Sequence, residues 1–321
     1  MKDKIMSQAN SIKIIVGSSN PELGKQLCAS MGLDPCKSEV IQFSEGNTFV
    51  RILENVRGSD VYIIQGVCFP VDKNFMELLF WVDAAKLASA AKVTAVIPFF
   101  SYAKADKKDE PRVSIRARVC ADALESAGVD RVLTMDLHSP QIQGFFKRPV
   151  DHMHARSIIC DFIKTKKLED LVVASADVGY GKNAFKYSDI LKVPTVIGNK
   201  IRKDHSEKSQ VWNVVGDVKD KNVLIVDDIV FTGGSLISMA EAVKALGAKK
   251  VYAAVTHGVL TKGATEKIDK SSIEELVITD TVEYRFQELS SKVKVLSVAQ
   301  SLSEAIQSIH EFKSISKLFP E

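Results

Sequence analysis

The chain of 321 residues is long enough for one large domain or two ordinary ones. Hydrophobic residues make up 45% of it and charged residues 26%, which is typical of a soluble globular protein. The formal net charge of +3 is too small to predict a protein that coats nucleic acid, so we expect no nucleic-acid partner.

Cysteine use and the N-terminal sequence both favour a cytoplasmic location. The five cysteines are an odd number and include no C-x-x-C pair, which argues against a disulfide framework and against a thiolate zinc site. The first ten residues contain no apolar segment of signal-peptide length. The apolar runs are far shorter than the roughly 20 residues that span a bilayer, so we expect no membrane association.

Short β-branched runs recur along the chain and predict buried strands. In chain order they are Ile12–Val16, Val61–Ile64, Val93–Ile97, Val132–Met135, Leu171–Ala174, Thr195–Ile197, Val223–Val226, Val251–Val255, Leu276–Ile278 and Val293–Val298. Segments with helical spacing lie between many of these runs. The clearest are Met76–Ala91, Ile115–Ala127 and Leu236–Leu246, and the last two are followed by a glycine that is typical of a helix end.

Strands that alternate with helices predict an α/β protein with mostly parallel sheets. The alternation occurs once before about residue 150 and again after it, which predicts two doubly wound domains. We place the N-terminal α/β domain at residues 11–153, together with the C-terminal tail 311–321, and the C-terminal α/β domain at residues 154–310. Ligands of such folds bind beyond the carboxyl ends of the strands, so the residues directly after each apolar run are the candidate site residues.

The run Val223–Val226 is followed by two acids and a glycine-hydroxyl turn. Asp227 and Asp228 can accept hydrogen bonds from sugar hydroxyls. Thr232-Gly233-Gly234-Ser235 precedes a predicted helix, whose N–H groups and positive dipole end bind phosphate. No G-K-[ST] follows, so this is not a Walker A loop. The pattern favours a sugar phosphate over an ordinary strand, turn and helix cap.

A resemblance extends this interpretation to the whole chain. The segment VLIVDDIVFTGGS at 223–235 resembles the phosphoribose-binding signature of type I phosphoribosyltransferases. Within that group, the chain from about Ile12 to Phe319 is similar to the ribose-phosphate pyrophosphokinases. The segments that carry the similarity include SSNPELGKQL, FSEGN, VRGSDVYIIQG, MELLFWVDAAKLASA, VIPFFSYAKADKK, MDLHSPQIQGFF, SADVGYGK, VVGDVKDKNVLIVDD and SISKLFP.

The resemblance implies a reaction and its participants. The diphosphoryl group of ATP is transferred to the C1 hydroxyl of ribose 5-phosphate, and the products are 5-phosphoribosyl 1-diphosphate and AMP. The implied cofactor is Mg²⁺. The implied assembly is a homo-oligomer built from dimers, either a hexamer or a smaller one.

The resemblance also assigns site residues. Ribose 5-phosphate is expected at Asp227, Asp228, Thr232, Gly233, Gly234 and Ser235. ATP is expected at Phe43, Glu45, Asn47, Lys104, Asp109 and His138. The metal is expected at His138 and Asp177, and the catalytic cations are Lys200, Arg202 and Lys104.

Several substitutions motivate an alternative function. Lys104 and Ala105 stand where the family usually has arginine and glutamine, and lysine lacks the planar fork of arginine. Asn47 replaces a usual glutamate and Phe231 a frequent aspartate. The alternative is a non-catalytic paralogue that regulates an active synthase. A phosphoribosyltransferase is disfavoured by the additional N-terminal α/β domain and the basic loop.

One further pattern points to metal chemistry. His152 and His154 form an H-x-H pair that is compatible with a transition-metal site. Two histidines without a third ligand nearby in sequence are weak support, so the favoured interpretation is that they are structural.

Overall fold

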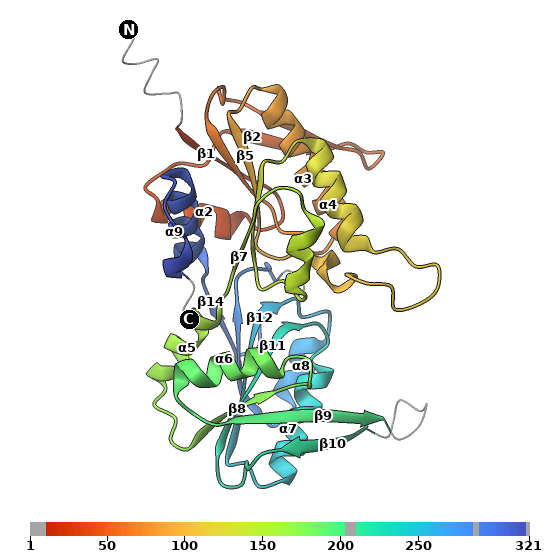
Figure 1. Ribbon diagram of the computed structural model, residues 1–321, viewed down its shortest axis with the longest axis vertical. Coiled ribbons are helices and arrows are strands. Elements are labelled where there is room, and N and C mark those ends of the chain that lie inside the picture. The colour runs from red at the N-terminus through yellow and green to blue at the C-terminus, as the bar shows by residue number, and fades with distance from the viewer. Residues whose placement is uncertain (1–10, 203–209, 285–288, 319–321) are drawn as a thin grey trace. The chain divides into compact units, whose positions relative to one another are not determined.

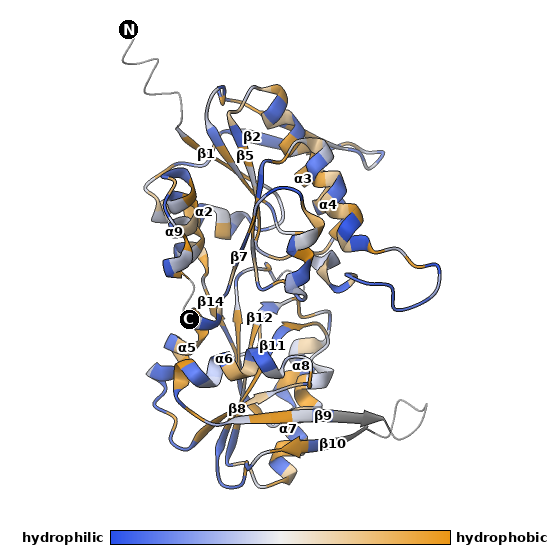
Figure 2. Ribbon diagram, in the orientation of Figure 1, coloured by the Kyte–Doolittle hydropathy of each residue, from blue (hydrophilic) through white to orange (hydrophobic). Residues whose placement is uncertain are grey.

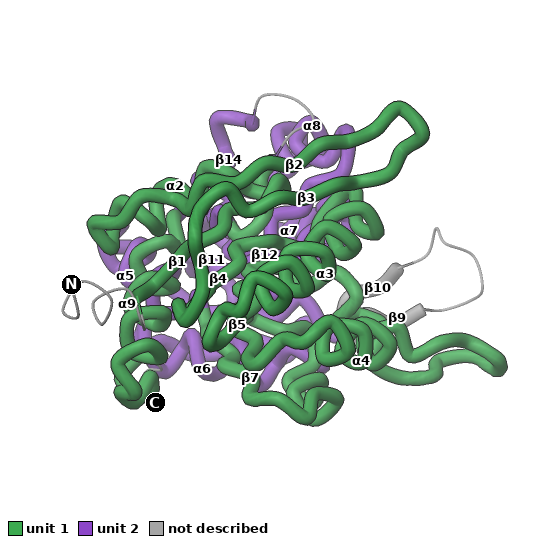
Figure 3. The backbone as a smooth tube through the Cα atoms, turned by 90° about the horizontal axis from the view of Figure 1, so that it is seen from above, with its two compact units in different colours: residues 1–154, 281–283, 297–321 green, residues 155–280, 284–296 purple. Residues whose placement is uncertain are grey.

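The computed structural model describes residues 11–202, 210–284 and 289–318, with the backbone alone for 200–202 and 210–212. The chain divides into two compact units (Figure 3). Unit 1 comprises residues 1–154, 281–283 and 297–321, and unit 2 comprises residues 155–280 and 284–296. Both units are α/β, as the sequence predicts.

Unit 1 contains a five-stranded sheet in the order β1-β4-β5-β6-β7, in which every neighbouring pair is parallel. The strands are β1 (Ile12–Val16), β4 (Asp60–Ile64), β5 (Lys92–Ile97), β6 (Arg131–Met135) and β7 (Val150–Met153). All five residues of β4 are buried, because a parallel sheet covered on both faces needs continuous apolar runs. A separate antiparallel hairpin joins β2 (Ser38–Gln42) to β3 (Thr48–Ile52).

Helices cover both faces of this sheet (Figure 1). On one face lie α3 (Val71–Leu87) and α4 (Arg116–Ala127), whose buried side chains share a core with Val61, Ile63 and Ala95. On the other face lie α2 (Pro21–Ser30) and α9 (Ala299–His310). The hydroxyl of Tyr62 in β4 donates to the carbonyl of Ile306 in α9 at 3.4 Å. The 3-10 segments of this unit are η1 (Ser101–Lys104), η2 (Pro140–Phe145) and η3 (Ser316–Leu318).

The structure assigns helix α9 to a different domain than the sequence-based division does. That division assigned residues 299–310 to the C-terminal domain, whereas the contacts of α9 assign it to unit 1. Its residues Leu302, Ala305 and Ile306 are fully buried, and the His310 ring contacts Asp60 at 3.0 Å. The chain therefore returns to its first unit after completing the second.

Unit 2 contains a seven-stranded sheet in the order β10-β9-β8-β11-β12-β13-β14. Its strands are β8 (Leu171–Ser175), β9 (Thr195–Arg202), β10 (Gln210–Val215), β11 (Asn222–Val230), β12 (Lys250–Gly258), β13 (Ile273–Thr279) and β14 (Val293–Leu296). Only the pair β9–β10 is antiparallel among these described pairs. Helices α5 (Arg156–Thr165), α6 (Gly181–Leu191), α7 (Gly234–Ala245) and α8 (Ala264–Asp269) complete the unit.

The strand order of unit 2 creates a topological switch point. The chain leaves β8 through α6 and returns beside it as β9, and the next parallel strand, β11, lies on the other side of β8. Helices α7 and α8 pack on the core that contains Val223, Ile225 and Val255. In open α/β sheets, ligands bind at the carboxyl ends of the strands on either side of such a point. Here those ends are Ser175 and Val226, which are partners across the two strands.

Candidate functional site

Strand β11 continues past its neighbour and carries the two acids. Its pairing with β8 stops at Val226, but its pairing with β12 continues to Val230 opposite Gly258. The sequence prediction ended this strand at Val226 and is corrected here, because the β12 ladder holds the next four residues extended. Asp227 and Asp228 therefore project from a strand rather than from a loop. This gives them a fixed backbone.

The acids at the switch point form an electrostatically unfavourable group. Burial, and then the neighbouring carboxylates of Asp228 and Asp177, raise the pKa of Asp227 well above its ordinary value. The Asp228 amide donates to Asp227 Oδ1 at 2.9 Å. Asp177 follows β8 by two residues, and its Oδ1 accepts the Tyr180 amide at 2.7 Å. A bound cation or the hydroxyl donors of a sugar would relieve this repulsion.

The segment after β11 presents a helix N-terminus. Gly233 caps α7 in the left-handed region at φ 76°. Thr232, Gly234 and Ser235 are exposed, and the Gly234 amide makes only a long contact of 3.4 Å with Thr232 Oγ1. Exposed amides and hydroxyls at the start of a twelve-residue helix suit a phosphate group. All six residues expected to bind ribose 5-phosphate thus lie in the segment that runs from the end of β11 to the first turn of α7.

Phe231 has a structural role in this segment. Its carbonyl accepts two hydrogen bonds from Thr261, at 2.8 Å from the amide and 3.2 Å from the hydroxyl. The amide of Leu260 donates to the Val230 carbonyl at 3.1 Å. The turn after β12 therefore fixes the backbone at residue 231, whatever the side chain there. This anchoring preserves the shape of the loop even though phenylalanine cannot accept a sugar hydroxyl.

In unit 1, the residues expected to bind ATP are all exposed. Phe43, Glu45 and Asn47 form the tip of the β2–β3 hairpin, which is closed by a bond from the Phe43 amide to the Asn47 carbonyl at 2.9 Å. Phe43 is 43% exposed, and its ring centroid lies 6.2 Å from that of Phe49. An aromatic face in this position is available for stacking on a base.

Lys104 and Asp109 belong to the loop between β5 and α4. Lys104 ends η1 and is exposed, whereas its neighbour Ala105 is buried. Residues 107–112 are all exposed, and this loop projects from the body of unit 1 and is largely hydrophilic (Figure 2). At its base, the Ala117 amide donates to the Ala105 carbonyl at 3.2 Å. The loop is thus a highly charged, solvated segment on a fixed base, as a closing lid requires.

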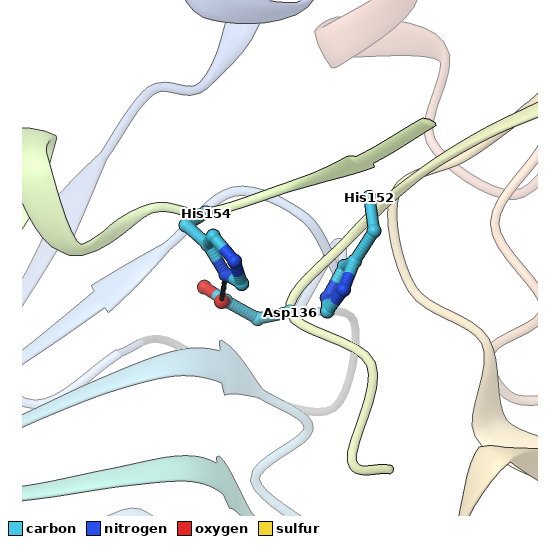
Figure 4. Close-up of side chains that lie close together, drawn as sticks. All are labelled: Asp136, His152 and His154. Carbon is cyan, nitrogen blue, oxygen red and sulfur yellow. Dashed lines mark hydrogen bonds and ion pairs between the residues drawn. The ribbon is translucent and has the colours of Figure 1, made fainter. Parts of the chain in front are cut away.

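His138 lies just beyond β6 and is exposed. Near it, the structure brings together three side chains that the sequence did not group. His154 Nδ1 lies 2.7 Å from Asp136 Oδ1, and the rings of His152 and His154 are 4.6 Å apart (Figure 4). The H-x-H spacing of His152 and His154 indicated part of this cluster, but the third residue, Asp136, is distant from them in sequence. It becomes a neighbour only because β6 and β7 are adjacent and parallel.

Three further sequence features concern the catalytic cations, the cysteines and membrane-spanning helices. Lys200 and Arg202 belong to β9, but their side chains lie outside the described residues. The five cysteines are buried, and no disulfide joins any two of them. Within the described residues, no helix has the length and apolar composition that crossing a membrane requires.

Comparison with known proteins places the whole chain. Residues 12–128 match the family described as the N-terminal domain of ribose phosphate pyrophosphokinase, and residues 172–320 match the phosphoribosyl synthetase-associated domain. A ribose-phosphate pyrophosphokinase of Caldanaerobacter subterraneus subsp. tengcongensis is 45% identical over 311 residues, which cover 97% of this chain and 98% of the relative. This chain belongs to the ribose-phosphate pyrophosphokinase family.

Other family members agree with this placement. The ribose-phosphate pyrophosphokinase of Chlorobaculum tepidum is 44% identical over 309 residues, covering 96% of this chain and 95% of the relative. The crystal structure of phosphoribosylpyrophosphate synthetase from Mycobacterium smegmatis matches with a TM-score of 0.89 at 35% identity, and covers 94% of this chain and 100% of that chain. The resemblance inferred from the sequence motifs is thereby confirmed.

Proposed function

We propose that this chain transfers the diphosphoryl group of ATP to the C1 hydroxyl of ribose 5-phosphate, giving 5-phosphoribosyl 1-diphosphate and AMP. Full-length similarity to ribose-phosphate pyrophosphokinases supports the reaction. The observation that carries the substrate assignment is the junction of β11 and α7. There, two acids and a glycine-capped helix N-terminus follow the switch point of unit 2 within a few residues.

The residues at this junction divide the substrate between them. The exposed amides and hydroxyls of Thr232, Gly234 and Ser235 hold the 5-phosphate, and Gly233 lets the backbone turn toward it. Asp227 and Asp228 accept hydrogen bonds from the ribose hydroxyls. Because these groups are mounted on a strand and a helix, they orient C1 before the reaction and reduce its entropic cost.

Unit 1 supplies the groups for ATP. The Phe43 ring stacks on the adenine, and Glu45 and Asn47 at the same hairpin tip offer hydrogen bonds to its polar edge. Lys104 and Asp109 lie on the projecting loop, which closes over the phosphates. Lys104, Lys200 and Arg202 stabilise the negative charge on the transferred group, since both substrates are anionic.

The acids of the switch point fit Mg²⁺. This cation prefers oxygen ligands, and burial together with the carboxylates of Asp228 and Asp177 raises the pKa of Asp227, a cost that a bound cation would offset. The residues that we assign to the ion are Asp177 and His138, and His138 would act directly or through water. When bound, Mg²⁺ neutralises phosphate oxygens and makes the β-phosphorus more electrophilic.

The anomeric hydroxyl then attacks the β-phosphorus and AMP leaves. No covalent enzyme intermediate is needed, so alignment and charge stabilisation account for the catalysis. A homo-oligomer built from dimers, a hexamer or a smaller assembly, stays part of the proposal, and analytical ultracentrifugation measures it. The cytoplasmic location stays a prediction from the sequence.

Measurement of AMP with the purified chain alone tests the activity. With ATP, Mg²⁺ and ribose 5-phosphate, we expect AMP to form at a rate that depends on ribose 5-phosphate, and Asp228→Ala to abolish it. A chain that forms no AMP over a range of phosphate concentrations, but alters the rate of an added active synthase, would instead be the non-catalytic paralogue.

A further inference from the structure

The ends of β6 and β7 bring three side chains of metal-binding types together. The two strands are parallel, with Thr134 opposite His152 and Met135 opposite Met153. One residue further, the Asp136 amide donates to the Met153 carbonyl at 2.9 Å, so the chain stays paired as the sheet ends. Asp136 and His154 therefore follow adjacent strands at the same edge. His152 is two residues before His154.

The side chains of this cluster converge (Figure 4). Asp136 Oδ1 and His154 Nδ1 are 2.7 Å apart, and one ligand atom from each of Asp136, His152 and His154 lies within 4.8 Å of the others. The side chains of His154 and Asp136 are only 21% and 14% exposed, which limits competition from water. His152 Nε2 accepts the Leu137 amide at 2.8 Å, which fixes its ring.

The backbone of Asp136 adds a second indication. Its φ of 36° lies in the left-handed region, which is unfavourable for a non-glycine residue. Strain of this kind persists where the surrounding structure determines it, and it is frequent at ligand sites. In this case the residue carries the carboxylate that contacts His154.

We propose that Asp136, His152 and His154 bind a transition dication of the Zn²⁺, Co²⁺ or Ni²⁺ type in the absence of nucleotide. Two imidazoles and one carboxylate are a common ligand set for such ions, and water completes it. Bonds of about 2.0–2.1 Å to zinc place tetrahedral ligands roughly 3.3 Å apart, so small side-chain movements close the cluster. The cation replaces the hydrogen between Nδ1 and Oδ1, and the His154 ring then carries its hydrogen on Nε2.

This site differs from the Mg–ATP site proposed above. Mg²⁺ requires mostly oxygen ligands, and the cluster offers one carboxylate against two nitrogens. His138 is not a member of the cluster, although it lies two residues from Asp136. An ion here ties the start of the His138 segment to the end of β7. If His152 binds the ion through Nε2, it loses the hydrogen bond that this atom accepts from the Leu137 amide. This loss weakens its net contribution, so His154 and Asp136 are the stronger ligands.

Binding is tested on the full chain without nucleotide, using Co²⁺ and Zn²⁺ alone as probes. Co²⁺ should give the intense visible bands of a four-coordinate site, and Zn²⁺ should displace it with a stoichiometry of one ion per chain. Excess Mg²⁺ should not abolish the bands. Weak bands of six-coordinate Co²⁺, or complete loss of the bands in Mg²⁺, would overturn the proposal without any variant.

Matched glutamine variants locate the ion. His154→Gln and His152→Gln should each weaken Zn²⁺ binding by more than about tenfold, as loss of a metal-site residue does. His138→Gln should leave it unchanged. Circular dichroism establishes that each variant is folded, and Asp136→Asn replaces any that is not. Zn²⁺ binding that survives in His154→Gln but is lost in His138→Gln would assign the ion to the ATP site and contradict the inference.

Discussion

The acids at the switch point lower the stability of the folded chain. They are Asp227, Asp228 and Asp177. Burial and like charge raise the pKa of Asp227, so its charged form is disfavoured in the folded chain. The cost to folding is absent below the pKa of Asp227 in the unfolded chain, grows as the pH rises toward its folded pKa, and is fully present above it. A protein retains such a group when a ligand needs its charge.

At the residue scale we predict that Asp227→Asn stabilises the ligand-free protein at neutral pH and inactivates it. The amide removes the charge but keeps the shape, so the unfolding temperature should rise at neutral pH and change little in acid. Asp217→Asn is the matched control, since the hydrogen bond from Lys221 lowers the pKa of Asp217 and its loss should not stabilise the protein. A lower unfolding temperature for Asp227→Asn at neutral pH would refute the electrostatic argument.

The sequence alone identified these acids, but it did not predict the strand that carries two of them or the proximity of the third. The adjacent acids and the T-G-G-S turn both lie within residues 227–235, so their chemistry can be inferred from the local sequence. The extension of β11 to Val230 depends on its pairing with β12, which is not encoded locally. The proximity of Asp177 to Asp227 depends on the order of β8 and β11 in the sheet. Both follow from non-local pairing.

At the scale of elements, two helices in unit 2 begin alike but differ in their proposed role. Gly233 caps α7 at φ 76° and Gly263 caps α8 at φ 82°. Both are in the left-handed region, where a Cβ costs about 1–2 kcal/mol. A Cβ on Gly233 would meet Ile268 Cγ1 at 3.4 Å, and one on Gly263 would meet no atom within 4 Å.

We therefore predict that Gly233→Ala and Gly263→Ala destabilise the protein to a similar extent, but that only Gly233→Ala raises the KM for ribose 5-phosphate. The reason is that only the α7 cap is proposed to bind phosphate. Thermal unfolding gives the first quantity and steady-state kinetics the second. An equal rise in KM for both variants would mean that strain, rather than phosphate contact, causes the effect.

Elements without strong apolar runs escaped prediction. The hairpin strands β2 and β3 have no fully buried residue, and β7 contains Asp151 and His152 among its four residues. Such strands are specified by their partners more than by their own sequence. In contrast, β4 and β8 are buried throughout and were predicted from their apolar runs within one or two residues at each end.

At the scale of the whole molecule, unit 1 is completed by a helix from the far end of the chain. Asp60, at 3% exposure, accepts one hydrogen bond from the Tyr62 hydroxyl at 3.0 Å and contacts the His310 ring. Helix α9 covers this group and packs beside α2. The sequence-based division assigned α9 to the C-terminal domain because of its position in the chain. The pattern of an amphipathic helix shows which of its faces is buried, but not which sheet that face packs on.

We predict that Ile306→Ala destabilises unit 1 by about 2–5 kcal/mol, the usual cost of truncating a fully buried isoleucine. Amide hydrogen exchange should accelerate in α2, β1 and β4. The matched control is Ile268→Ala, an equally buried isoleucine of α8, which should accelerate exchange in unit 2 instead. Faster exchange confined to unit 2 in Ile306→Ala would contradict the assignment of α9.

The most direct test of the proposed function follows the β-phosphorus of ATP. The purified chain is incubated with ATP labelled at that atom, Mg²⁺ and ribose 5-phosphate, and the products are separated. Diphosphoryl transfer predicts that the label appears in 5-phosphoribosyl 1-diphosphate, together with an equal amount of unlabelled AMP. Label recovered in ADP, or label that remains in ATP under all conditions, would contradict the account.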